Sequence, residues 1–139
     1  MRRHLNRERI RNEKGQAITE LALVLPILAV LLFGIIQFGI VFNHYVTLTD
    51  AVRAGARKAV VSRQEASPAG VAAQAVRDSA EDLPDAGDPA VLEVQVSPGT
   101  PWASGSDVTV TAWYPYDISL LGWVVKSGRL SSTTTERVE

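Results

Sequence analysis

A carboxylate at the edge of a long apolar stretch is the first feature of this chain that could do chemistry. Glu20 directly precedes residues 21–42, which are 22 residues with no charge and a single amide, Gln37. As a helix this stretch would reach about 33 Å, enough to cross a hydrocarbon core of about 30 Å. A carboxylate is costly there, so Glu20 either finds a cationic partner or sits in the headgroup zone and stabilises the positive end of the helix dipole.

The residues before this stretch are basic. Residues 1–15 hold six basic and two acidic side chains, a net charge of +4, while the rest of the chain has a net charge of −5. Such a flank predicts that the N-terminus stays in the cytoplasm and the C-terminal part crosses the membrane. The block is short and adjoins the apolar segment directly, which disfavours a nucleic-acid partner. We expect residues 1–15 to form a flexible, solvated cytoplasmic leader.

The apolar stretch is better explained as a retained membrane helix than as a cleaved secretory signal. A signal peptide has an apolar core of about 7–15 residues followed by a small-x-small cleavage site. Here the core is longer, and Asn43, His44 and Tyr45 follow it. Helix-forming residues then continue, so we predict one helix over residues 17–63, within a segment 16–64. Pro26 should kink this helix.

The remainder, residues 65–139, is predicted to be an extracytoplasmic α+β domain. Small residues in the exported half of the long helix would pack either inside this domain or between subunits (Ala51, Ala54, Gly55, Ala56, Ala59). Ser67 and Pro68 predict the N-cap and first turn of a short second helix. Alternating apolar residues predict antiparallel strands at 91–97 and 107–116, with Pro115 ending the second. We expect 118–125 to be a loop or a helical turn that caps the core or faces lipid or a partner, 126–128 to be a turn, and 129–139 to be a third strand.

Catalytic and metal chemistry find no support in the residues. The chain has no cysteine, and its two histidines, His4 and His44, have no metal-ligand spacing. The acidic residues between 78 and 88 lack the ligand spacing of a calcium loop and are better explained as a solvated surface. Phosphate-loop, nucleophile-elbow and zinc-protease motifs are absent from the sequence. We therefore expect no enzyme, no cofactor and no metal site.

The segment GQAITEL at residues 15–21 resembles the N-terminus of the type IV pilin superfamily. In that family a prepilin peptidase cuts after such a glycine, and a glutamate is the fifth residue of the mature chain. The larger pattern, RNEKGQAITELALVLPILAVLLFGIIQFG followed by LTDAVRAGARKAV, resembles the TadE-like proteins of Flp-type (tight adherence) pili. The resemblance covers about residues 11–60; Leu21 stands where many members have Phe.

The resemblance implies a processing site at Gly15 and Gln16 and an assembly or peptidase-recognition role for Glu20. Glu20 would pair with the freed amine of Gln16, its own or that of a neighbour. The implied protein is a minor pilin or pseudopilin in the cytoplasmic membrane, with a pilin-like domain outside. Its partners would be membrane lipid, the prepilin peptidase, other pilin and pseudopilin subunits and assembly-platform proteins. The alternative is an uncleaved single-pass anchor that displays a small binding domain, with Trp102 and Trp123 as contacts.

Overall fold

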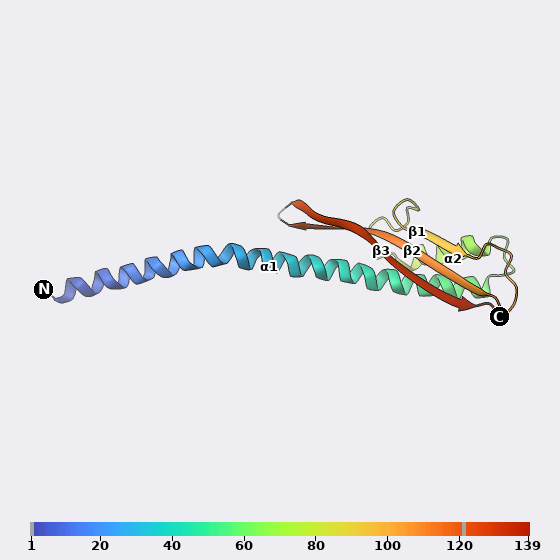
Figure 1. The fold of residues 1–139 in the computed structure, drawn as a ribbon, viewed down its shortest axis with the longest axis horizontal. Helices are drawn as coiled ribbons and strands as arrows, with labels where there is room; N and C mark the ends of the chain where they lie inside the picture. The colour runs from blue at the N-terminus through green and yellow to red at the C-terminus, as the bar shows by residue number, and fades with distance from the viewer. Residues whose placement is uncertain (1, 121) are drawn as a thin grey trace. The chain divides into compact units, whose positions relative to one another are not determined.

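The computed structural model describes residues 2–120 and 122–139, with side chains described from residue 15 onward. The elements in chain order are α1 (Arg2–Val61), α2 (Pro68–Ser79), β1 (Glu93–Ser97), β2 (Asp107–Leu120) and β3 (Trp123–Arg137). The chain divides into two compact units, Met1–Gln37 and Phe38–Glu139, and α1 contributes to both (Figure 1). A long apolar helix, a short helix and a three-stranded antiparallel sheet confirm the predicted α+β class.

The first helix begins earlier than predicted. We expected a flexible leader before residue 17, but α1 starts at Arg2, so that expectation is wrong for residues 2–15. These residues contain no proline and are mostly good helix formers, and extending an existing helix carries no nucleation cost. The other end agrees closely with the prediction. The helix stops at Val61, and the Ser62 hydroxyl donates to the carbonyl oxygen of Lys58 (2.7 Å).

The apolar part of α1 is not covered by the protein. In the described part of the chain, one helix, Gly15–Val61, is long and apolar enough to span a membrane, and none of its most apolar window is buried. Large apolar side chains such as Leu23, Ile27 and Phe38 are each about two-thirds exposed. A helix that is apolar all round needs an apolar environment. The chain is therefore a single-pass membrane protein by the character of this helix.

The sheet is an antiparallel meander in the order β1-β2-β3. Val94 pairs with Ala112, and Tyr114 pairs with Leu130. Alternate residues of β2 are buried from Val108 to Tyr114, while the threonines between them face outward. On that outer face two threonine pairs join β2 to β3 through their hydroxyls, namely Thr109 with Thr135 (2.8 Å) and Thr111 with Thr133 (3.0 Å). The sheet thus has one apolar and one polar face, as its alternating sequence predicts.

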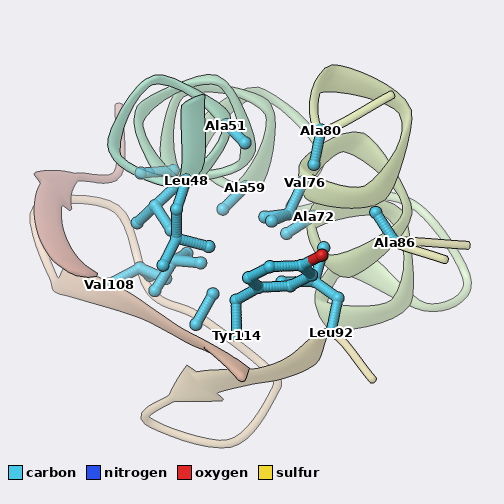
Figure 2. Packing of buried hydrophobic residues seen from close by; sticks show 14 of the residues in the cluster. Leu48, Ala51, Ala59, Ala72, Val76, Ala80, Ala86, Leu92, Val108 and Tyr114 are labelled. Atoms are coloured by element: carbon cyan, nitrogen blue, oxygen red, sulfur yellow. The ribbon is translucent and has the colours of Figure 1, made fainter. Parts of the chain in front are cut away.

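The core of the second unit lies between the apolar face of the sheet and the two helices (Figure 2). Residues of α1 at helical spacing are fully buried in it (Leu48, Ala51, Val52, Ala56, Ala59). Val76 of α2 and Tyr114 of β2 meet them from the other elements. A Cβ built on Gly55 would overlap Val76 Cγ2 and lie 3.1 Å from the Ala72 carbonyl oxygen. The small residues of α1 therefore pack inside the domain, which answers the question that the sequence left open.

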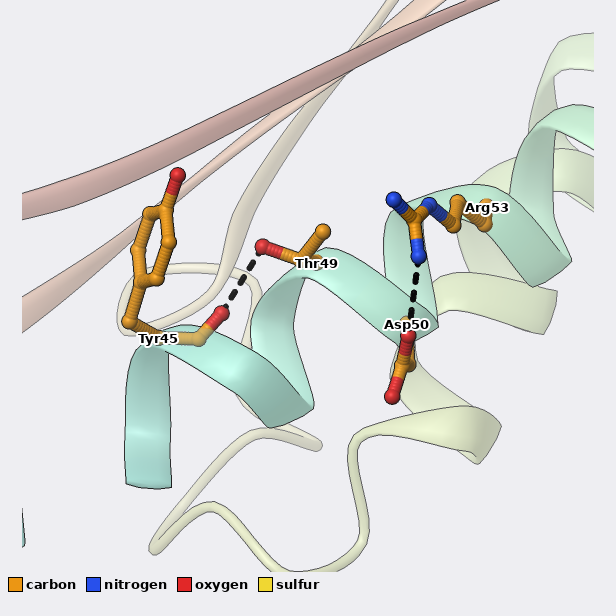
Figure 3. A network of polar contacts seen from close by, with 4 residues as sticks. All are labelled: Tyr45, Thr49, Asp50 and Arg53. Atoms are coloured by element: carbon orange, nitrogen blue, oxygen red, sulfur yellow. Dashed lines mark hydrogen bonds and ion pairs between the residues drawn. The ribbon is translucent and has the colours of Figure 1, made fainter. Parts of the chain in front are cut away.

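The opposite face of α1 is polar. Figure 3 shows Asp50 and Arg53 paired at 3.4 Å, and Thr49 donating to the Tyr45 carbonyl oxygen at 2.9 Å. The side chains of Asp50 and Arg53 are largely exposed. An exposed pair of this kind contributes only about 0.3–0.5 kcal/mol. This face therefore confers solubility on the exported half of α1 rather than much stability.

Two expectations about β2 are wrong. Pro115 lies within β2 instead of ending it, and residues 118–120 and 123–125 are strand rather than a loop or helical turn. The pairing of β1 with β2 stops at Trp113, so beyond that point β2 has a partner only in β3. A proline at such an open edge removes no ladder hydrogen bond. The hairpin turns between Leu120 and Trp123, where Gly122 has a φ of 84°.

The third strand and the second helix also differ from the prediction in detail. β3 begins at Trp123 rather than at residue 129, so residues 126–128 belong to the strand and do not turn the chain. α2 begins at Pro68 as predicted, but the Ser67 side chain makes no capping hydrogen bond. Instead the Ser67 carbonyl oxygen accepts from the Val71 amide (2.9 Å), the ordinary first bond of a helix.

Candidate processing and assembly site

The candidate site is one exposed helical turn at the N-terminal edge of the apolar stretch. Gly15, Gln16, Thr19 and Glu20 all lie on α1, and all are exposed. Gln16 and Glu20 are four residues apart, so they share a face of the helix. The structure thus brings three of the four predicted site residues, Gly15, Gln16 and Glu20, into a single turn.

The backbone at Gly15 is open. Apart from the adjoining backbone of α1 and the two neighbouring residues, no heavy atom of the described residues lies within 4 Å of where a Cβ on Gly15 would stand. Its carbonyl oxygen accepts a hydrogen bond from the Thr19 hydroxyl (3.0 Å). Glycine is the weakest helix former after proline, by roughly 1 kcal/mol relative to alanine. The bond between Gly15 and Gln16 is therefore sterically reachable, but a peptidase would have to unwind this turn and break the Thr19 contact to bind it extended.

The carboxylate of Glu20 already reaches back to residue 16. The Gln16 side-chain amide donates to Glu20 Oε1 at 3.1 Å. Helical side chains lean toward the N-terminus of their helix, so the Glu20 carboxylate lies over the turn before it. If the chain began at Gln16, a new ammonium would appear at the residue that this carboxylate reaches. The same carboxylate would also face the first turn of the helix, where the dipole favours negative charge.

Pro26 stands apart from these three residues. It lies six positions after Glu20, a rise of about 9 Å along the axis, and α1 continues through it as α-helix. Pro26 has no amide hydrogen, so one backbone bond of α1 is missing at this point. The kink that we expected there stays a prediction.

The two tryptophans considered as binding contacts have different environments. Trp102 is buried, and its indole nitrogen donates to the Pro98 carbonyl oxygen at 2.9 Å. Trp123 is 82% exposed at the tip of the β2–β3 hairpin, beside Val124 and Val125, which are each 62% exposed. Trp102 is therefore a core residue. The sequence signal for this tip is the apolar run at 118–125. In the structure β1 stops pairing with β2 at Trp113, well before this part of the hairpin.

Tyr114 joins the sheet to the helix and to the loop after α2. Its ring contacts the ring of His44 edge-on (centroids 5.7 Å apart), and its hydroxyl donates to the Pro84 carbonyl oxygen at 2.9 Å. Burial, and to a smaller degree the negative charge of Asp85, raises the pKa of the Tyr114 phenol above its ordinary value. Sequence patterns do not reveal this role, since it depends on three segments far apart in the chain.

Metal chemistry finds no arrangement to support it in the described residues. Between residues 15 and 139, leaving aside residue 121, no three side chains from His, Asp and Glu gather as a metal site would require. In the loop after α2, the Asp88 carboxylate accepts a hydrogen bond from the Ala90 amide at 2.8 Å. This is a local turn contact.

The comparison with known protein families agrees with the resemblance of the sequence. Residues 15–57 match the family model described as TadE-like protein. This match runs from Gly15 through the apolar stretch into the buried part of α1, and it covers less than a third of the chain. No curated protein and no solved structure matches the chain. The match and the single apolar helix fit a membrane protein associated with a Tad pilus, a structural rather than an enzymatic family.

Proposed function

We propose that this chain is a minor pilin or pseudopilin of a Tad (Flp-type) pilus or a related type IV filament or secretion system. A prepilin peptidase cuts it after Gly15, and the mature chain assembles through α1. The observation that carries the proposal is the turn from Gly15 to Glu20, where an open glycine precedes a carboxylate that already contacts residue 16. The family match begins at this same glycine.

Cleavage after Gly15 creates a positive charge close to the carboxylate of Glu20. Hydrolysis of the Gly15–Gln16 peptide leaves a carboxylate on Gly15 and an ammonium on Gln16. Glu20 then accepts from this ammonium, in its own chain or in a neighbouring copy, and so enters a low-dielectric assembly without an unpaired charge. Before the cut, the Gln16 amide is a neutral donor to the same oxygen. Processing thus replaces a hydrogen bond from a neutral donor with an ion pair.

The membrane orientation in this proposal is inferred from the charges that precede the apolar stretch of α1. The net charge of +4 on residues 1–15 keeps the N-terminus in the cytoplasm, and the unit that follows the span lies outside the cytoplasmic membrane. The prepilin peptidase, the assembly platform and other pilin subunits are the partners in this account. Residues 65–139 form the exported domain, whose polar outer sheet face remains open to solvent.

A Glu20→Gln variant tests the assembly role. We expect it to insert in the membrane and to be depleted from sheared pili, because the amide cannot neutralise the Gln16 ammonium. Asp50→Asn is the matched control, since it also removes a carboxylate from α1, but one in an exposed pair with Arg53. Immunoblots of the membrane and sheared fractions give the ratio of pilus-incorporated to membrane-inserted protein for each variant. Equal incorporation of the Glu20→Gln variant and the wild type would contradict the pairing.

The alternative is an uncleaved single-pass anchor that displays a binding domain, and the exposure of Trp123 is the observation that favours it. Trp102 does not contribute, because it is buried. Under this alternative a chain with Glu20→Gln would behave like the wild type in every fraction. Loss of an extracellular ligand on Trp123→Ser, with normal processing, would add a display role to the first proposal rather than replace it.

A further inference from the structure

We propose that the tip of the β2–β3 hairpin, described over residues 118–120 and 122–125, inserts into the outer interface of the membrane that α1 crosses. The tip is the most exposed apolar segment of the second unit outside α1: Trp123 is 82% exposed, and Val124 and Val125 are each 62% exposed. The inference rests on the proposed insertion of α1. It adds a second membrane contact, in which the partner is the boundary between lipid headgroups and acyl chains.

The hairpin extends along α1 toward the end that enters the membrane. The opposite end of the sheet lies by the C-terminal end of α1, because Glu139 shares a shallow hollow with Val60 and Val61. Asp107 pairs with Arg137 near that end. Tyr114, farther along β2, contacts His44. β2 therefore runs antiparallel to α1, and its last residues lie beyond His44 in the direction of Phe38.

The hairpin is long enough to reach the outer end of the apolar stretch of α1. Six residues separate Tyr114 from Leu120, or about 20 Å of strand. His44 lies two residues past the apolar stretch, and from His44 to Phe38 the helix rises only about 9 Å. Part of the strand length is therefore enough to bring the tip level with the exposed rings of Phe38 and Phe42. In Figure 1 the hairpin extends well past β1, so no third strand covers this part of it.

The residue types fit the interface of a membrane. Tryptophan is enriched at the headgroup level, where its ring is half in apolar surroundings. Lys126, which pairs with Ile118 at the base of the tip, can keep its ammonium among lipid phosphates while its stem lies along the apolar part. Asp117 pairs with Ser127 one position further back. This polar pair limits the inserted part of the described hairpin to residues 118–120 and 122–125.

Single cysteines in the full chain provide the test, because the natural sequence has none. Val124→Cys reports on the tip, exposed Ser131→Cys on β3 is the matched control, and Ile35→Cys reports on the membrane span. Each variant is labelled with an environment-sensitive fluorophore and reconstituted in phosphatidylcholine–phosphatidylglycerol vesicles that contain nitroxide-labelled lipid. Val125→Cys repeats the tip measurement in case the first variant does not fold.

We expect the label at residue 35 and the label at residue 124 to be quenched by the nitroxide lipid, with blue-shifted emission. The label at residue 131 should stay like that of a water-exposed group. Quenching at residue 35 but not at residue 124 would overturn the inference and leave the membrane span intact. A shift at residue 124 that disappears when the protein is diluted into excess lipid would also overturn it, because another copy of the chain would then be the partner. Absence of quenching at residue 35 would contradict membrane insertion itself, and with it both proposals.

Discussion

Replacement of Gly55 by alanine tests how the exported half of α1 is built into the domain. Gly55 is buried where α1 crosses α2, and the added methyl group would overlap Val76 Cγ2 and approach the Ala72 carbonyl oxygen to 3.1 Å. Val76 cannot swing away easily, because a β-branched side chain in a helix has one strongly preferred rotamer. The helices must therefore move apart, or Val76 must adopt a strained conformation.

The magnitude follows from two opposing terms. Overpacking of this kind typically costs about 1–3 kcal/mol. Alanine in a helix interior recovers about 1 kcal/mol relative to glycine. The net effect is therefore a destabilisation between about 0 and 2 kcal/mol, and the overlap with the stiff Val76 side chain places Gly55→Ala toward the upper end of that range. For a folded unit of about 100 residues, each kcal/mol lowers the midpoint temperature by roughly 4–8 °C.

The assay is chemical or thermal unfolding of the full chain in detergent micelles, followed by near-ultraviolet circular dichroism. Gly39→Ala is the matched control, because it lies on the same helix and a Cβ there would meet nothing within 4 Å. A Gly55→Ala/Val76→Ala double variant should be more stable than the sum of the two single effects predicts, since the colliding methyl group is gone. A Gly55→Ala protein as stable as the wild type, or strictly additive effects, would refute the proposed packing.

Two further predictions concern the sheet. Because the pKa of the Tyr114 phenol is raised in the fold by burial and by Asp85, the stability that depends on its neutral form is present below about pH 10 and is lost as the pH rises through the folded-state pKa. Tyr114→Phe removes the hydrogen bond to Pro84, so its unfolding free energy at neutral pH should be about 1 kcal/mol lower than that of the wild type. At alkaline pH the unfolding free energy of this variant should fall less steeply. Equal slopes of unfolding free energy against alkaline pH for both proteins would contradict this. Arg129→Ala, by contrast, should change the unfolding free energy by less than about 0.5 kcal/mol, because the Arg129–Glu93 pair is half-exposed; urea titration measures this, and a loss well above that value would show a stronger role for the pair.

The placement of the candidate site residues could be predicted from the sequence because these residues are close together in the chain. Gln16 and Glu20 are four residues apart, so their spacing alone places them on one face once the segment is known to be helical, and Gly15 directly precedes Gln16. The apolar length of residues 21–42 is likewise a property of consecutive residues. The contact between Gln16 and Glu20 needs no long-range information, and the structure has it.

The length of the β2–β3 hairpin could not be predicted in the same way. Pro115 looks like a strand terminator, and its tolerance depends on where β1 stops pairing with β2, which the sequence of β2 does not encode. The packing partner of Gly55 could not be predicted from the sequence either, because a run of small residues can pack against a helix of the same chain or of another chain. The position of Val76 decides between them. The leader was mispredicted for another reason, since its charged residues favour both solvation and helix.

The most direct test of the central claim is the intact mass and N-terminal sequence of the protein purified from membranes with a cognate prepilin peptidase present. Cleavage after Gly15 gives a chain that begins at Gln16, and we expect this result. Gly15→Leu is the matched control; a Cβ at this position would meet no side chain of the described residues within 4 Å, and we expect this variant to remain uncut. A wild-type chain that still begins at Met1 under these conditions would contradict the account.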